Sequence, residues 1–122
     1  MDEHAQLLDE IRTLVGSRWM SQAIYAATEL HIVDALAKET RTAAEVADVV
    51  DADPGATARL LRALATLGIV EAVGDREFAL TSLGSLLCEE APDSVRGSVM
   101  LTLGPHAWRA WGALVDLSLI HI

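Results

Sequence analysis

The sequence is poor in positive charge. Nine Lys and Arg residues stand against 18 Asp and Glu, which gives a formal net charge of −9, and Lys38 is the only lysine. Because proteins bind nucleic-acid phosphates mainly through Lys and Arg, this balance disfavours a nucleic-acid partner. The preference for arginine over lysine, together with abundant Ala, Val, Asp and Gly, indicates a GC-rich genome such as that of a high-GC bacterium.

Cysteines and long apolar runs are also scarce. Cys88 is the only cysteine, so no disulfide can form within the chain and a reducing cytoplasm is expected. The longest uncharged run, Gly97 to Trp108, is shorter than the ~20 residues that cross a bilayer, and Gly104-Pro105 interrupts it. The first residues, MDEHAQLLDE, are acidic, unlike those of a signal peptide. We therefore expect a cytoplasmic protein without a membrane partner.

Motifs of catalysis and cofactor binding are missing. The glycines are isolated, so there is no G-x-G-x-x-G phosphate loop, and no G-x-S-x-G nucleophile elbow occurs. His4, His31, His106 and His121 form no H-x-H or H-x-x-x-H pair that favours a metal ion. The sequence thus predicts no catalytic, cofactor-binding or metal-binding residue in this chain. We expect His31 at a helix C-terminus, where the helix dipole favours a positive charge.

Residues 1–41 predict three helices. The first is amphipathic, with its apolar residues at helical spacing, and Gly16-Ser17 is expected to end it, with Ser17 capping the next helix. The second, SRWMSQAIYAATEL, contains small residues that allow close packing on more than one side. A short third helix covers IVDALAKE. The apolar face of the first helix comprises Leu7, Leu8, Ile11, Leu14 and Val15.

Residues 42–81 predict a winged helix–turn–helix. Thr42-Ala-Ala-Glu45 is a capping box that begins one helix, and Asp53-Pro54 begins the next, which Gly68 ends. Residues 69–73 and 77–80 are expected to be strands of a hairpin joined by a Gly74-Asp75 turn. The residues expected to face inward are Val46, Val49, Val50, Leu60, Leu61, Leu64 and Leu67. The fold class is therefore mainly α, with one β-hairpin wing and extra N-terminal helices.

Residues 82–116 predict further helices. Thr81 begins a short one, Asp93 is expected to cap a second, and Gly104-Pro105 ends that helix and begins the last, HAWRAWGALVD. The tail LSLIHI, residues 117–122, does not continue the charged, helical pattern of the residues before it. The codons CTG TCT CTT ATA CAC ATC would encode it, and this string matches the mosaic-end adapter of a transposon-based sequencing library. We expect residues 117–122 to be a sequencing scar, with an apolar helix end as the alternative.

The helix–turn–helix lacks the basic face of a DNA reader. A recognition helix presents polar and basic side chains to the major groove. The candidate exposed positions of the second helix are Thr57, Ala58, Arg59, Arg62, Ala63 and Thr66. The charges of Asp75, Arg76 and Glu77 in the wing nearly cancel. The arginines are better explained as solvated charges that pair with nearby acids than as nucleic-acid contacts.

The order of these elements resembles a known family. The matching pieces are AATELHIVDAL, TAAEVA, the LLRALATLGIVE run and FALTSLGSLL, followed by W-x-x-L at Trp111 to Leu114. They resemble the N-terminal dimerisation domain of S-adenosylmethionine-dependent small-molecule O-methyltransferases, which include polyketide- and anthracycline-tailoring enzymes, plant phenolic enzymes and acetylserotonin methyltransferase. The resemblance covers roughly Ser17 to Asp116, and glycine usually stands where this chain has His31.

The resemblance implies a homodimer. In this family two copies intertwine, the winged helix no longer binds DNA, and residues 1–41 would supply the dimerisation helices. The family's cofactor loop, its acidic residue for the ribose and its general-base histidine all lie beyond the equivalent of Asp116. The implied chain is a dimerisation and substrate-lid module of a larger enzyme. That enzyme would use S-adenosylmethionine to methylate a hydroxyl of a small aromatic or polyketide-like substrate.

The resemblance also implies candidate substrate contacts at Trp19, Met20, Met100, His106 and Trp108. Trp19 and Met20 lie on the second helix, which in the family can reach the partner's pocket, whereas the other three precede the catalytic domain. Aromatic and thioether side chains suit flat substrates. Packing at the dimer interface or in the core is the favoured explanation for Trp19 and Met20. For Trp108 packing and substrate contact are equally favoured, and for Trp111 packing is preferred.

Two other functions remain open on the sequence alone. Residues 42–81 are compatible with a winged-helix transcriptional regulator, which would bind DNA in a salt-sensitive way. The apolar C-terminal third is compatible with a free-standing ligand-binding or scaffold protein, provided that the gene ends at Ile122.

Overall fold

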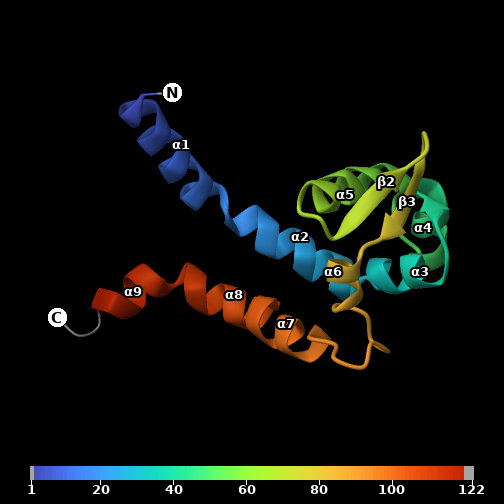
Figure 1. Ribbon diagram of the computed structural model, residues 1–122. Helices are drawn as coiled ribbons and strands as arrows, with labels where there is room; N and C mark the ends of the chain where they lie inside the picture. Colours follow the sequence, from blue (N-terminus) through green and yellow to red (C-terminus); the bar gives the residue numbers. More distant parts are fainter. Residues whose placement is uncertain (1, 120–122) are drawn as a thin grey trace.

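The computed structural model describes residues 2–119, without the side chains of Leu117 and Leu119. A compact lobe carries two helical arms that diverge from it, one N-terminal and one C-terminal (Figure 1). The elements in chain order are α1 (Glu3–Gly16), α2 (Arg18–Glu29), α3 (Ile32–Lys38), β1 (Arg41–Thr42), α4 (Ala43–Val50), α5 (Pro54–Thr66), β2 (Val70–Val73), β3 (Glu77–Leu80), α6 (Ser82–Ser85), α7 (Arg96–Leu103), α8 (Pro105–Gly112) and α9 (Leu114–Leu119).

The predicted mainly-α fold class is confirmed, and so is the hairpin. β2 and β3 pair antiparallel, with Val70 opposite Leu80 and Val73 opposite Glu77, and Gly74 in the turn has a φ of 61°. A third strand, β1, which the sequence did not predict, pairs with β3 through Arg41 and Phe78. The sheet order is therefore β1-β3-β2, and helices α3 to α5 complete the lobe.

Local capping signals place the helix–turn–helix as expected. The Thr42 hydroxyl accepts a hydrogen bond from the Glu45 amide at 3.2 Å, and the Glu45 carboxylate accepts one from the Thr42 amide at 2.8 Å. These bonds hold the pKa of Glu45 below its usual value. Asp53 caps α5 by accepting from the Ala56 amide at 2.7 Å, and Gly68 ends that helix with a φ of 78°.

The core lies where α2, α3, α4 and α5 meet the sheet. Its largest fully buried aliphatic side chains are Ile32, Val33, Val46, Leu61, Leu64 and Val70. The short helix α6 is held against this core by Thr81, whose hydroxyl donates to the carbonyls of Gly68 and Ile69. Gly84 of α6 is itself buried beside Ile69. The chain thus crosses from the sheet to the C-terminal arm through a closely packed corner.

Two predicted orientations in the helix–turn–helix are wrong. Val49 is 53% exposed, because the buried face of α4 is centred on Val46, Ala47 and the partly buried Val50, and Val49 projects to one side of it. Thr57, expected among the exposed positions of α5, is only 3% exposed because it lies on the same helical stripe as Leu61 and Leu64.

Three predicted helix boundaries are also wrong. Ser17 does not cap α2, because it has helical geometry and its hydroxyl donates to the Leu14 carbonyl at 2.9 Å. Asp93 does not cap α7. This helix begins at Arg96, and the amide of the preceding Val95 donates to the Leu86 carbonyl at 2.7 Å. The last predicted helix is divided at Ala113 into α8 and α9.

His31 follows the C-terminal end of α2, as expected, but it is also the N-cap residue of α3, whose Ala35 amide donates to its carbonyl at 3.0 Å. Its amide donates to the Thr28 carbonyl at 3.2 Å, and its backbone is left-handed, with a φ of 61°. Such a conformation favours glycine, and a non-glycine residue adopts it only where its surroundings hold it. Of the predicted tail, Leu117 to Leu119 continue α9, whereas residues 120–122, with His121, lie outside the described residues.

Candidate functional site

The five candidate substrate contacts are divided between the two arms. Trp19 and Met20 lie on α2, Met100 on α7, and His106 and Trp108 on α8. The tryptophans and His106 are exposed, and the methionines are half-buried. α2 packs against α7, and α7 is followed directly by α8, so the two groups lie on neighbouring arms. One copy of the chain leaves these aromatic surfaces open to solvent.

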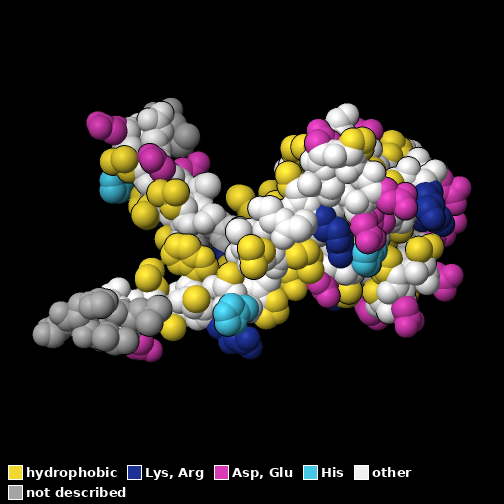
Figure 2. All heavy atoms as spheres, turned by 90° about the horizontal axis from the view of Figure 1, so that it is seen from below, with side chains coloured by type: hydrophobic (Ala, Val, Ile, Leu, Met, Phe, Trp, Pro, Cys, Tyr) yellow, Lys and Arg dark blue, Asp and Glu magenta, His cyan; other side chains and the backbone are white. Residues whose placement is uncertain are grey.

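Exposed apolar side chains are concentrated on the same arms. Figure 2 shows hydrophobic side chains along both arms, while charged side chains are frequent on the lobe. α1 contains no buried residue, and Val15 is 74% exposed. The exposed large apolar residues of the arms are Leu7, Leu8, Ile11, Leu14, Val15, Trp19, Leu101, Trp108, Trp111, Leu114 and Val115. Apolar surface gathered in this way marks an interaction site.

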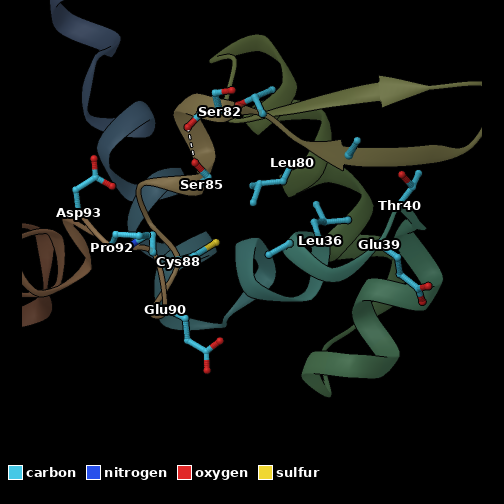
Figure 3. Close-up of a pocket in the computed structure, with 14 residues that line it drawn as sticks. Leu36, Glu39, Thr40, Leu80, Ser82, Ser85, Cys88, Glu90, Pro92 and Asp93 are labelled. Carbon is cyan, nitrogen blue, oxygen red and sulfur yellow. Dashed lines mark hydrogen bonds between the residues drawn. The ribbon is translucent and has the colours of Figure 1, made fainter.

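A groove that sequence reasoning missed lies on the lobe beside α3, β3 and α6. Its volume is about 680 Å³, and Leu36, Leu80 and Cys88 provide its apolar lining, with Glu39, Glu90 and Asp93 also along it (Figure 3). Its lining residues come from segments that are far apart in the chain, so no local sequence motif predicts this groove. The Ser85 hydroxyl in this groove is bonded within α6, where it donates to the Ser82 carbonyl at 2.6 Å. Burial, with the charge of Asp34, raises the pKa of the Cys88 thiol, which disfavours the nucleophilic thiolate.

The helix–turn–helix surface does not form a basic face. Arg59 and Arg62 are exposed on α5, and Arg76 is exposed in the hairpin. A hollow of about 440 Å³ between helix and hairpin contains Arg62 and Arg76, but Asp75 lies there too. With Thr57 buried, the helix presents fewer polar groups than the sequence predicted. Nothing in this geometry supports the DNA-binding alternative.

The described residues do not fit a nucleotide-type cofactor. A glycine-rich phosphate cradle joins a strand to a helix in a parallel sheet, whereas residues 2–119 contain one small antiparallel sheet. The glycines with positive φ, Gly68 and Gly74, end a helix and form the hairpin turn. Within the described part of the chain, no three His, Cys, Asp or Glu side chains gather to hold a metal ion. Nor does any described helix combine the length and apolarity of a membrane span.

Comparison with known proteins now decides the family. The family profile described as "O-methyltransferase dimerisation domain" matches residues 13–90, from α1 to the loop after α6. The chain belongs to the O-methyltransferase dimerisation-domain family. Self-association is the property that defines this domain, and the exposed apolar arms of the chain agree with it.

Individual relatives of this dimerisation domain are small-molecule methyltransferases. The chain is 42% identical over 102 residues to 3-amino-4-hydroxybenzoate 4-O-methyltransferase of Streptomyces cremeus, an alignment that covers 83% of the chain and 28% of the relative. The structure of a mitomycin 7-O-methyltransferase superposes with a TM-score of 0.84 at 31% identity, over 93% of the chain and 34% of that protein. Human N-acetylserotonin methyltransferase in complex with SAM superposes with a TM-score of 0.78 at 30% identity, over 95% and 34%. The chain thus spans about a third or less of each relative's length.

Proposed function

We propose that this chain is the homodimerisation and substrate-lid module of a cytoplasmic S-adenosylmethionine-dependent O-methyltransferase. The parent enzyme would act on a hydroxyl of a small aromatic or polyketide-like molecule. The family match and the names of the relatives support the reaction class. Cofactor and methyl-transfer chemistry would be supplied by other parts of the parent enzyme, because the described residues do not fit the cofactor.

The observation that carries the dimer proposal is the unpaired face of α1. Its apolar residues follow helical spacing and remain exposed, and none of the closely packed element pairs of residues 2–119 includes α1. A helix of 14 residues gains little stability by itself in water, so burial against another surface would stabilise it. Each aliphatic side chain that becomes fully buried contributes about 1.5–3 kcal/mol. A second copy would supply that surface, and two-fold pairing is the commonest arrangement.

The lid proposal rests on the chemistry of the exposed arm residues. Trp19, Met20, Met100, His106 and Trp108 present ring and thioether surfaces, which suit contact with flat apolar molecules. His106 would add a polar group for orientation. In the full-length enzyme, Trp108→Ala is expected to raise KM for an aromatic acceptor more than it lowers kcat. An unchanged KM would favour a packing role for Trp108.

A matched pair of substitutions tests the dimer. Ile11 on α1 and Val49 on α4 are almost equally exposed, at 52% and 53%. Ile11→Glu would place two carboxylates in the proposed interface and should raise the dimer dissociation constant at least about tenfold, because unpaired charges are costly to bury. Val49→Glu, on the lobe, should leave the constant unchanged. Sedimentation velocity between nanomolar and micromolar concentration measures both. A monomeric wild-type chain at micromolar concentration would contradict the proposal.

The assignment of residues 117–122 to a sequencing scar remains a separate prediction. Resequencing the source locus with a library method that uses no transposon tests it. A reading frame that continues from Asp116 into a strand and a glycine-rich turn would agree with the prediction, and a gene that stops after Ile122 would refute it.

A further inference from the structure

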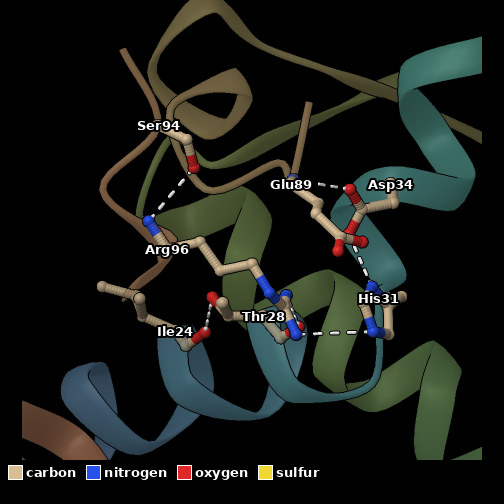
Figure 4. Close-up of polar contacts among 7 residues, drawn as sticks. All are labelled: Ile24, Thr28, His31, Asp34, Glu89, Ser94 and Arg96. Atoms are coloured by element: carbon tan, nitrogen blue, oxygen red, sulfur yellow. Dashed lines mark hydrogen bonds and ion pairs between the residues drawn. The ribbon is translucent and has the colours of Figure 1, made fainter. Parts of the chain in front are cut away.

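A connected polar cluster joins the end of α2 to the beginning of α7 (Figure 4). The His31 ring lies between Asp34 and Arg96, with Nδ1 3.1 Å from Asp34 Oδ2 and Nε2 3.4 Å from Arg96 Nη2. Arg96 also donates through Nη1 to the Thr28 carbonyl at the end of α2. The other Asp34 oxygen accepts from the Glu89 amide at 2.9 Å. The cluster therefore connects α2 and α3 to both ends of the loop that precedes the C-terminal arm.

The donors and acceptors of this cluster fix the state of the His31 ring. A carboxylate only accepts hydrogen bonds, so Nδ1 must carry a hydrogen to bond Asp34. A guanidinium only donates, so Nε2 must be unprotonated to accept from Arg96. One neutral tautomer, with the hydrogen on Nδ1, satisfies both contacts.

Protonation of the ring removes only one of these contacts. The cation has hydrogens on both nitrogens, so it keeps Asp34 but can no longer accept from Arg96. Other charged groups near the ring are Lys38 on α3 and Arg41 on β1, which line the same hollow, Glu29 at the end of α2, and Glu89 in the loop. These neighbouring groups carry charges of both signs, so they act on the ring in opposite directions. The loss of the Nε2 acceptor does not depend on them, because it follows from protonation of the ring itself. In that hollow α4 presents only Val49 and Val50.

We propose that His31 is a proton-sensitive contact, which helps to secure the first turn of α7 to the lobe while its ring is neutral. When the ring is protonated, His31 loses its bond to Arg96, and the Thr28 carbonyl is left as the remaining partner of the guanidinium. The side chain is 48% exposed, so protons reach it without unfolding. The His31–Asp34 pair persists on protonation, so the contact within the lobe is kept. The expected response is therefore local to the start of the C-terminal arm.

This contact has a consequence for acceptor binding that rests on the proposed function. α7 carries Met100 and leads into His106 and Trp108 on α8, so a less fixed first turn loosens one side of the proposed lid. The contact between His31 and Arg96 does not itself depend on methyl transfer, and it can be measured on this chain without substrate or cofactor.

Hydrogen–deuterium exchange of peptides covering residues 95–103 tests the proposal at pH 8 and pH 5.5, after correction for the pH dependence of intrinsic exchange. In the wild-type chain, protection of this segment should be about two- to tenfold lower at pH 5.5, which corresponds to one hydrogen bond. Protection of α5 should stay the same. Each pH is measured at two protein concentrations tenfold apart, so that dissociation of a dimer, which depends on concentration, is distinguished from loss of the bond between His31 and Arg96.

Three variants separate His31 from other titrating groups. His31→Asn tolerates the left-handed backbone and has no titrating ring, so protection should be equal at both pH values. His31→Gly suits the backbone but removes the ring, so protection should be low at both. His106→Gln on α8 should behave like wild type. Equal protection of the wild-type chain at both pH values, or a pH response that persists in His31→Asn or disappears in His106→Gln, would overturn the proposal.

Discussion

Replacement of Gly84 by alanine tests how closely the short helix α6 packs against Ile69 and Leu80. A Cβ atom at this position would lie 2.1 Å from the Ile69 carbonyl oxygen and 2.8 Å from Leu80 Cδ1. Leu80 can change rotamer, but the Ile69 carbonyl belongs to the backbone, so α6 must move by about 1 Å to reach ordinary contact. This movement strains the bonds of Thr81, whose hydroxyl and amide both donate to the Ile69 carbonyl, at 2.8 and 3.3 Å.

The expected loss of stability follows from these contacts. Overpacking in a well-packed site costs about 1–3 kcal/mol, and each weakened hydrogen bond adds about 1 kcal/mol. We therefore expect Gly84→Ala to lower the free energy of unfolding by about 3–5 kcal/mol. Urea denaturation followed by circular dichroism measures this change as a lower midpoint with an unaltered slope.

A second glycine provides the control. A Cβ at Gly97, in α7, would meet nothing within 4 Å. Because alanine is the better helix former, Gly97→Ala should leave the midpoint unchanged or raise it, by up to about 1 kcal/mol. The close packing of α6 on Ile69 is refuted if the free energy of unfolding of Gly84→Ala lies within about 0.5 kcal/mol of the wild-type value while Gly97→Ala behaves as expected.

Two further predictions concern titratable groups. Because the pKa of Glu45 is lowered in the folded chain, its stabilising contribution is present above the unfolded value and is lost as pH falls through the folded value. The gap in urea midpoint between wild type and Glu45→Ala should therefore narrow between pH 6 and pH 3, and a constant gap would contradict the capping-box explanation. Because burial raises the pKa of Cys88, iodoacetamide at pH 7.5 should alkylate the folded chain far more slowly than the urea-unfolded chain. Mass spectrometry measures the modified fraction, and equal rates would show that the thiol is accessible and ionised.

Features decided by neighbouring residues were predictable from the sequence. The capping box of Thr42, the Asp53 cap and the Gly68 stop all depend on side chains within three residues of the bonds they form, or on backbone freedom at one position. The hairpin between residues 70 and 80 is similarly local, since its turn residues are adjacent. For the same reason the mainly-α class followed from helical periodicity.

Features decided by distant contacts were not predictable. Val49 and Thr57 both satisfy helical spacing, and only the packing of α4 and α5 on the core decides which side each faces. Aspartate is a favourable helix N-cap residue, so Asp93 was a reasonable prediction. The Val95 amide instead donates to the Leu86 carbonyl, and α7 begins at Arg96. β1 has two residues and exists as a strand because β3 lies beside it. The groove at Cys88 and the cluster at Arg96 are each formed by segments that are far apart in the sequence, so no sequence motif predicts either.

The sparse contacts of α1 have a consequence for the fate of a single subunit in the cell. A short helix without a partner frays, and frayed segments with exposed leucines are preferred sites for proteases and chaperones. Newly made copies that fail to meet another copy would be cleared from this end first. The residues that we propose to join two subunits would thereby also determine how many unassembled ones persist.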